Sequence, residues 1–208
     1  LLKISIGLWV VLSSNQTVGH GLGVVPKMII AKNREATGAW CVYHADVGNT
    51  KRLVLNTTAA EATDAVWGDT TPTSSVFTQR ITTSNDIDII AYCFAEVEGY
   101  SRISKYTGNG STDGPFVYTG FRPAWVLVKR TDSAKDWLLL DNKRDVDNVA
   151  QARLFPNLSD AESTTQSPMD ILSNGFKLRV SDTNYNENAG TYSYLAFAEM
   201  PFKYANAR

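Results

Sequence analysis

The stretch GVVPKMIIAK (residues 23–32) returns 97 residues later as GFRPAWVLVK (residues 120–129). Its Gly, Pro and Lys coincide in the two copies without a gap, and each copy continues to a tryptophan at the same spacing, Trp40 and Trp137. Between Pro and Lys the residues are largely apolar, as in a short buried strand. This pattern of identities indicates that the chain contains an internal duplication.

The duplication extends to the end of each copy. Further matches follow in the same order, at spacings that grow slightly because the second copy contains small loop insertions. They are Asn56, Glu61 and the closing string Phe94-Ala95-Glu96 in the first copy, and Asn157, Glu162 and Phe197-Ala198-Glu199 in the second. We therefore expect two repeats as domains, residues 1–97 and residues 98–208.

Both copies have the composition of a β protein. The chain has 208 residues, and its 20 Thr, 16 Ser and 14 Asn gather largely between short apolar runs. Such runs, separated by turn-forming residues, predict an all-β fold of the β-sandwich class. Two arrangements fit the pattern: two packed sandwiches, or one jelly-roll or lectin-like sandwich with pseudo-two-fold symmetry. Residues 145–153 have room for one or two helical turns.

The repeated tryptophans and prolines are expected to serve structure. A buried tryptophan supplies a large apolar area, so Trp40 and Trp137 are predicted to anchor the core. Pro26 and Pro123 come just before their strands, where the missing N–H removes no ladder hydrogen bond.

Charge and hydropathy exclude two classes of partner. The formal net charge is −1, with 7 Lys+Arg and 8 Asp+Glu in residues 1–97 and 13 of each in residues 98–208, so neither half is a basic nucleic-acid module. The longest apolar run, residues 4–12, is far shorter than the roughly 20 residues that span a bilayer. No cleavage site with small residues follows it, so we expect neither a signal peptide nor a transmembrane segment.

Few residues are suited to binding a metal or forming a disulfide. Cys41 and Cys93 each lie in an apolar strand-like run, which predicts small buried side chains, with a cross-strand disulfide as the alternative. The spacing of cysteine and histidine suits no zinc site. Residues 141–148 alternate Asp and Asn, whose oxygens suit calcium, but the Gly and terminal Glu of an EF-hand loop are missing. We expect no metal and no cofactor.

Catalytic signatures are equally sparse. His20 lies between glycines and aligns with Val117 of the second copy, so it is not expected to be a catalytic base. Glu96 and Glu98 are two apart on a strand-like stretch, an arrangement that a glycosidase could use. Only Glu96 recurs, as Glu199, so the simpler prediction is that each of these two glutamates binds a backbone N–H or one of the repeated lysines, Lys32 and Lys129.

Several strings together resemble a known class of module. These are residues 17–34, YTGNG (residues 106–110), VYTGFRPAW (residues 117–125) and the closing Ala-Phe-Ala-Glu. The sequence resembles, over roughly residues 15–203, a β-rich module of virion proteins from marine and cyanobacterial bacteriophages, of the tail-fibre and tailspike class. The resemblance implies a virion surface module for attachment to host glycans, with other virion proteins or further copies of the chain as partners. It supplies no catalytic residues.

The opening of the chain departs from that pattern. An aromatic-Thr-Gly-Asn-Gly string is expected before the first copy, but residues 7–14 read GLWVVLSS. We hypothesise that residues 1–14 are atypical of the fold and pack poorly.

Two loops combine an aromatic residue with amides or carboxylates, the groups that bind sugar rings and hydroxyls. They supply the predicted ligand-binding residues, which are Trp67 and Asp69 in one loop and Asn184, Tyr185 and Asn186 in the other. Core packing is the simpler prediction for Trp67, whereas the polar neighbours of Tyr185 predict exposure. The sequence thus predicts a non-enzymatic, adhesive or structural virion module. A polysaccharide-degrading tailspike-type glycosidase is the alternative.

Overall fold

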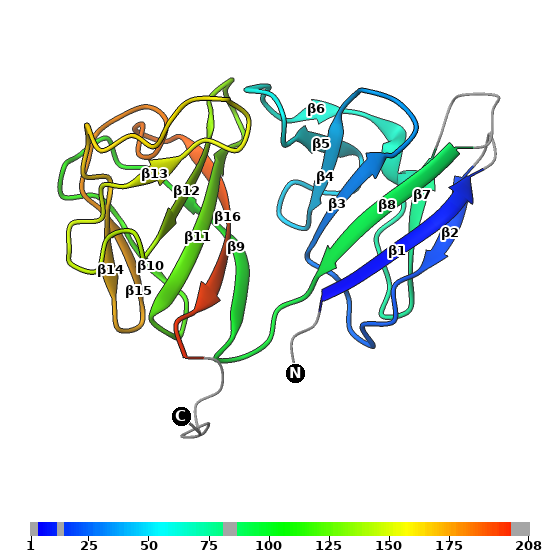
Figure 1. Ribbon diagram of the computed structural model, residues 1–208, viewed down its shortest axis with the longest axis horizontal. Coiled ribbons are helices and arrows are strands. Elements are labelled where there is room, and N and C mark those ends of the chain that lie inside the picture. The colour runs from blue at the N-terminus through cyan, green and yellow to red at the C-terminus, as the bar shows by residue number, and fades with distance from the viewer. Residues whose placement is uncertain (1–3, 12–14, 81–86, 201–208) are drawn as a thin grey trace. The chain divides into compact units, whose positions relative to one another are not determined.

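The computed structural model describes residues 4–11, 15–80 and 87–200, and the side chains within 15–80 and 88–200 (Figure 1). The chain divides into two compact units, Leu1–Glu96 and Val97–Arg208. In the described residues the regular elements are strands, apart from the short 3-10 helix η1 (Ala65–Trp67).

The first unit contains two antiparallel sheets. The larger sheet has the strand order β1 (Ile4–Val11), β8 (Ile87–Phe94), β3 (Met28–Asn33), β4 (Trp40–His44), β5 (Lys51–Val54) and β6 (Ala62–Thr63). The smaller sheet pairs β2 (Asn15–Gly19) with β7 (Val76–Arg80).

The second unit repeats this plan. Its larger sheet has the order β9 (Ser101–Thr107), β16 (Thr191–Ala198), β11 (Pro123–Arg130), β12 (Trp137–Asp141) and β13 (Arg153–Leu154). Its smaller sheet has the order β10 (Phe116–Tyr118), β15 (Gly175–Leu178) and β14 (Met169–Leu172).

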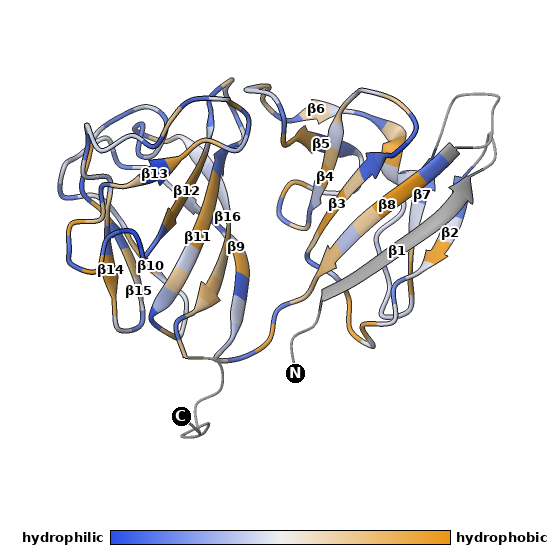
Figure 2. Cartoon of the chain, viewed as in Figure 1, coloured by the Kyte–Doolittle hydropathy of each residue, from blue (hydrophilic) through white to orange (hydrophobic). Residues whose placement is uncertain are grey.

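Each unit buries its own core between its two sheets. In the first unit, Val18 and Phe77 of the smaller sheet join Ile29 of the larger one in a single apolar cluster. In the second, residues of β10, β14 and β15 join residues of β9, β11, β12 and β16 in the same way. Hydrophobic residues concentrate in the strands of both units, and most loops are hydrophilic (Figure 2). The predicted all-β fold, a sandwich built by duplication, is confirmed, with a separate sandwich in each unit.

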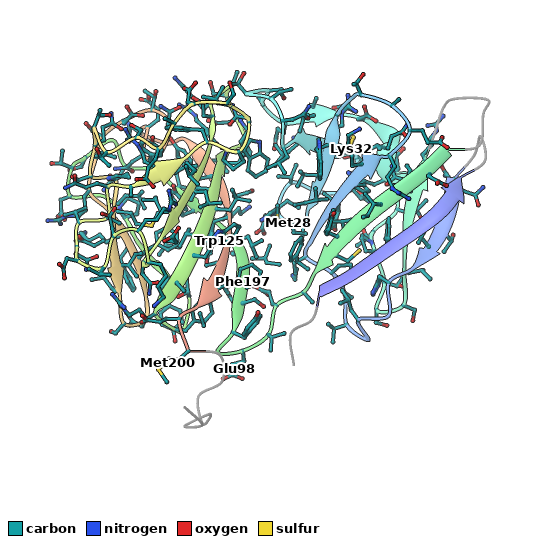
Figure 3. The ribbon with its side chains drawn as sticks, viewed as in Figure 1. Met28, Lys32, Glu98, Trp125, Phe197 and Met200 are labelled. Atoms are coloured by element: carbon teal, nitrogen blue, oxygen red, sulfur yellow. The ribbon has the colours of Figure 1, made fainter. Side chains whose placement is uncertain are left out.

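The two large sheets have the same register. Met28 faces Phe94 across β3 and β8, and at the equivalent place Trp125 faces Phe197 across β11 and β16. Trp125 and Phe197 lie side by side, with ring centroids 5.6 Å apart (Figure 3). Since strand register fixes which side chains face the core, a duplicated apolar pattern gives duplicated sheets.

The first strand fits the repeat. β1 pairs with β8 along its eight residues, and it lies at the sheet edge that β9 occupies in the second unit. Residues 4–11 thus form an edge strand, whereas the hypothesis that residues 1–14 pack poorly stays a prediction, because their side chains lie outside the described part of the chain. Residues 1–3 and 12–14 lie outside the described part of the chain.

The repeated Trp and Asn form the same hydrogen bond in both units, from the Trp backbone N–H to the Asn side chain. The N–H of Trp40 donates to Asn56 Oδ1 at 2.9 Å, and the N–H of Trp137 donates to Asn157 Oδ1 at 2.8 Å. The prediction of buried anchors holds for Trp137, whose side chain is 2% exposed, and not for Trp40, which is only partly buried. Neither indole belongs to the apolar cluster between the two sheets of its unit. Both tryptophans belong to the sheet face opposite the core, because the residues next to them on β4 and β12 face inward.

The repeated lysines bind hairpin loops. Lys32 Nζ donates to Ala36 O at 2.6 Å in the loop between β3 and β4, and Lys129 Nζ donates to Lys135 O in the loop between β11 and β12. For Glu199, a backbone N–H and Lys129 are the two predicted alternatives, and the structure shows an arginine partner. Glu199 instead accepts from Arg122 Nη1 at 2.7 Å.

Three further predictions concern the cysteines, residues 145–153 and membrane-spanning segments. Cys41 and Cys93 are free thiols, so the disulfide alternative is wrong. Residues 145–153 contain bends, an isolated bridge at Ala150 and the first residue of β13, and no helical turn. Within residues 4–11, 15–80 and 87–200, no helix has the length and apolar character needed to cross a bilayer.

Candidate binding face of the second unit

Trp67 and Asp69 flank Gly68 at the end of η1, where Trp67 is buried and Asp69 is exposed. The Trp67 side chain is buried and packs edge-on against Tyr43, with ring centroids 5.8 Å apart. The helix begins at Asp64, whose Oδ1 accepts from Val66 N at 2.9 Å, and ends at Gly68 in the left-handed conformation. Core packing of Trp67 is confirmed, and its indole has no face for a ligand.

The second predicted loop is also structural. The prediction that Tyr185 is exposed is wrong, because the side chain is only 2% exposed and its hydroxyl accepts from Arg153 Nη1 at 3.3 Å. Asn184 donates its side-chain amide to Asp182 Oδ1 at 2.8 Å, which closes the turn. Burial of the aromatic ring inside a polar segment gives no sequence signal, because its partners lie far along the chain.

Asn186 locks the YTGNG string in place. Its side chain is fully buried, its Oδ1 accepts from Asn109 N at 2.8 Å, and its Nδ2 donates to Ser111 O and Val180 O at 2.6 and 2.9 Å. Gly108 approaches the same loop so closely that a Cβ would lie 2.2 Å from Glu187 O. Loop packing therefore explains this one of the four strings on which the resemblance rests.

The other sequence candidates are engaged within the protein. Asp141 Oδ1 accepts from Lys143 N and Arg144 N at 2.9 and 2.8 Å, and the Asp145 carboxylate accepts from Gln151 N at 2.6 Å. The described part of the chain brings together no group of three His, Cys, Asp or Glu side chains suited to a metal ion. Glu98 lies in the turn between β8 and β9 and is exposed, so it does not share a strand face with Glu96.

His20 corrects the alignment of the repeats. Its Nδ1 accepts from Leu22 N at 3.2 Å, and in the second unit Thr119 Oγ1 accepts in the same way from Phe121 N at 3.4 Å. The backbone N–H of His20 donates to Ser75 O and that of Thr119 to Asn174 O, and these acceptors immediately precede β7 and β15. His20 thus takes the structural place of Thr119, not that of Val117, and its ring serves the turn.

With this alignment, β10 carries a feature that β2 lacks. Phe116 and Tyr118 alternate with the buried Val117, so both rings leave the sheet on the face opposite the core. They are 45% and 63% exposed, which makes them the only exposed aromatic residues among the described side chains. Large apolar side chains exposed next to each other make this face the candidate binding surface.

The structurally equivalent residues of the first unit have no such surface. Val18 pairs with Phe77 in the first unit, and Val117 pairs with Phe176 in the second. Thr17 is therefore structurally equivalent to Phe116. By the same register, Gly19 takes the place of Tyr118 and Val76 the place of Gly175. The sandwich therefore forms without these aromatic residues.

Glycines lie beneath or beside both rings. A Cβ on Gly175 would lie 3.0 Å from Cε2 and Cζ of Phe116 and 2.1 Å from Val117 O. A Cβ on Gly120 would lie 3.6 Å from the Tyr118 hydroxyl oxygen. A side chain at Gly175 would therefore collide with the Phe116 ring, whereas one at Gly120 would meet Tyr118 at ordinary contact distance.

Two ion pairs flank the rings. Lys177, which faces Phe116 in the register, contacts Asp113 at 2.8 Å, and Arg179 contacts Asp170 at 3.3 Å. The hydrogen bond and charge of Lys177 hold the pKa of Asp113 below its usual value. The face thus combines exposed rings with hydrogen-bonding groups whose charges balance.

Sequence reasoning missed Phe116 and Tyr118. The alternation Phe-Val-Tyr was visible, but three residues are too few to decide which face of a strand is buried. The register against β15, which only the folded chain supplies, decides it.

Comparison with known proteins places the whole duplicated structure in one family. No curated protein and no solved structure matches the chain. Residues 4–201 match a family model described as a domain of unknown function, DUF7483. The match spans both units, so the chain belongs to the DUF7483 family, and the pair of repeats is contained in the family's domain.

Proposed function

We propose that this chain is a non-enzymatic virion surface module that attaches a bacteriophage to host glycans through β10 of the second unit. The observation that carries the binding proposal is the exposed pair Phe116 and Tyr118, present in one repeat and absent from the other. The virion setting rests on the sequence resemblance alone.

The chemistry of the face suits sugars. The C–H faces of a pyranose ring are apolar and pack on an aromatic ring, while its hydroxyls need hydrogen-bond partners. Asp113 and Lys177 supply an acceptor and a donor beside Phe116, and Asn174, in the turn before Gly175, is exposed. These groups surround the two rings without burying them.

A glycan array that includes polysaccharides from bacterial surfaces tests the proposal. The wild-type chain is expected to bind a subset of the glycans, and the double variant F116A/Y118A is expected to lose that binding while keeping the same melting temperature. The matched control is L158A, because Leu158 is also exposed, at 41%, but lies elsewhere in the second unit. An array without signal for the wild-type chain, or equal binding by the double variant, would refute the proposal.

The exposed pair also suits a protein partner, which would make the module structural. Such a partner would need a matching apolar surface. Sedimentation of the wild-type chain alone separates this candidate from the first, because self-association that F116A/Y118A abolishes, without any glycan binding, favours a structural role.

A further inference from the structure

Resting on the proposed function, we infer that the β10 face binds an extended neutral oligosaccharide, at least two sugar units long, that lies along the strand. Three features of the face support this class of ligand: the spacing of Phe116 and Tyr118 along the strand, the lack of a side chain at Gly175, and the balance of charges.

The two rings are placed for two sugars. Phe116 and Tyr118 are separated by one residue on a strand, so their Cα atoms are about 6.7 Å apart along it. This Cα spacing is comparable to one sugar unit of a chain. We therefore assign a separate sugar unit to each aromatic side chain.

Gly175 has no side chain on the face that carries the two aromatic rings. Gly175 pairs with Tyr118, and the edge of the Phe116 ring extends over it. In the first unit, Val76 occupies the place of Gly175. A side chain at that position would collide with the Phe116 ring, because a Cβ there would lie 3.0 Å from its Cε2 and Cζ atoms.

The charges indicate that the ligand is neutral. Lys177 is already engaged by Asp113 and by Gly114 O, to which its Nζ donates at 2.8 Å. Arg179 is engaged by Asp170. An acidic sugar would have to displace a carboxylate from one of these cations, whereas hydroxyl groups can bind the ion pairs as they stand.

Calorimetric titration with sugars of increasing length tests the inference. The probes are glucose and N-acetylglucosamine, their β-1,4-linked oligomers of two to six units, and oligogalacturonates of the same lengths as the acidic series. For a neutral series that binds, we expect affinity to rise about tenfold from one sugar to two or three, since a second aromatic contact adds both stacking and buried area. F116A and Y118A are each expected to remove that gain, and L158A to keep it.

A charge variant sharpens the test. D113N removes the partner of Lys177, so it is expected to bind oligogalacturonates better than the wild-type chain does, with a salt-dependent affinity. Equal affinity for one sugar and for three, tighter binding of the acidic series by the wild-type chain, or no binding of either series would each overturn the inference. Glycan-array binding that F116A/Y118A abolishes would still support the proposed function, so the two failures are distinguishable.

Discussion

Gly175 shows how a single position joins the fold to the surface it carries. It lies in β15 beneath the edge of the Phe116 ring, and its Cα faces the backbone of β10 so closely that a Cβ would lie 2.1 Å from Val117 O. Glycine is therefore required there by the sheet as well as by the ring above it.

G175A is expected to destabilise the second unit by roughly 1–3 kcal/mol, because the added methyl group collides with backbone that cannot move freely. Urea unfolding measures the change. The control is G19A, since a Cβ on Gly19 meets its nearest atom at 4.0 Å and should change stability little. Equal stability of G175A and the wild-type chain would show that β10 and β15 are not packed as described.

Burial of the Cys93 thiol is expected to lower the unfolding free energy as the pH rises into the alkaline range. Burial raises the pKa of its thiol to about 12, above that of an exposed cysteine. The native state thus holds the proton more tightly, so the contribution is complete below the unfolded pKa of about 8.5 and is lost as pH rises toward 12. Between pH 9 and 11 the unfolding free energy should fall less steeply in C93A than in the wild-type chain, by about 1.4 kcal/mol per pH unit at most.

Denaturant unfolding at several pH values measures this slope. Buried tyrosines such as Tyr106 have raised pKa values too, so some alkaline loss remains in C93A. Identical slopes in the two proteins would contradict the burial of the Cys93 thiol.

At the scale of elements, the strands that repeat were predictable and the short ones were not. The apolar runs and the shared Gly-Pro-Lys-Trp pattern predicted the long strands of both large sheets, because central strands such as β11 and β16 are buried along consecutive residues and read as apolar runs. The turns were harder to predict. His20 and Thr119 both accept a hydrogen bond from the backbone N–H two residues later, but their side chains differ, so the sequence alignment did not match them. The strand β10 was not predicted because three residues are too few to show which face of a strand is buried.

The hairpin anchor gives a prediction that compares the two repeats. N157A leaves the N–H of Trp137 without its acceptor and is expected to cost about 1–2 kcal/mol, because this bond is partly buried. N56A removes the equivalent bond to Trp40, which is exposed to water, and should cost less. Thermal or urea unfolding of both variants measures the difference, and a larger loss for N56A would contradict the assigned roles.

At the scale of the whole molecule, one scaffold occurs twice with different surfaces. Sheet order, register and the Trp–Asn bond agree between the units, so these features are explained by folding alone. Phe116 and Tyr118 have no counterpart and are not required by the sandwich. Comparing the repeats therefore separates residues that serve the fold from those left for function, which the sequence alone could not do for β10.

This asymmetry predicts the binding stoichiometry. Because Thr17 and Gly19 replace the two aromatic residues in the first unit, each chain is expected to bind one oligosaccharide. Calorimetry with the tightest ligand of the length series gives the number directly. Two equivalent sites per chain would contradict a role specific to the second repeat.

The most direct test of the central claim is a map of backbone amide shifts by nuclear magnetic resonance during titration with that oligosaccharide. We predict that the shifts concentrate in β10, β15 and the turn at Ser173 and Asn174, and that β2 of the first unit stays unchanged. Shifts centred on any other surface, or shared equally by β2 and β10, would contradict the claim that Phe116 and Tyr118 form the binding face.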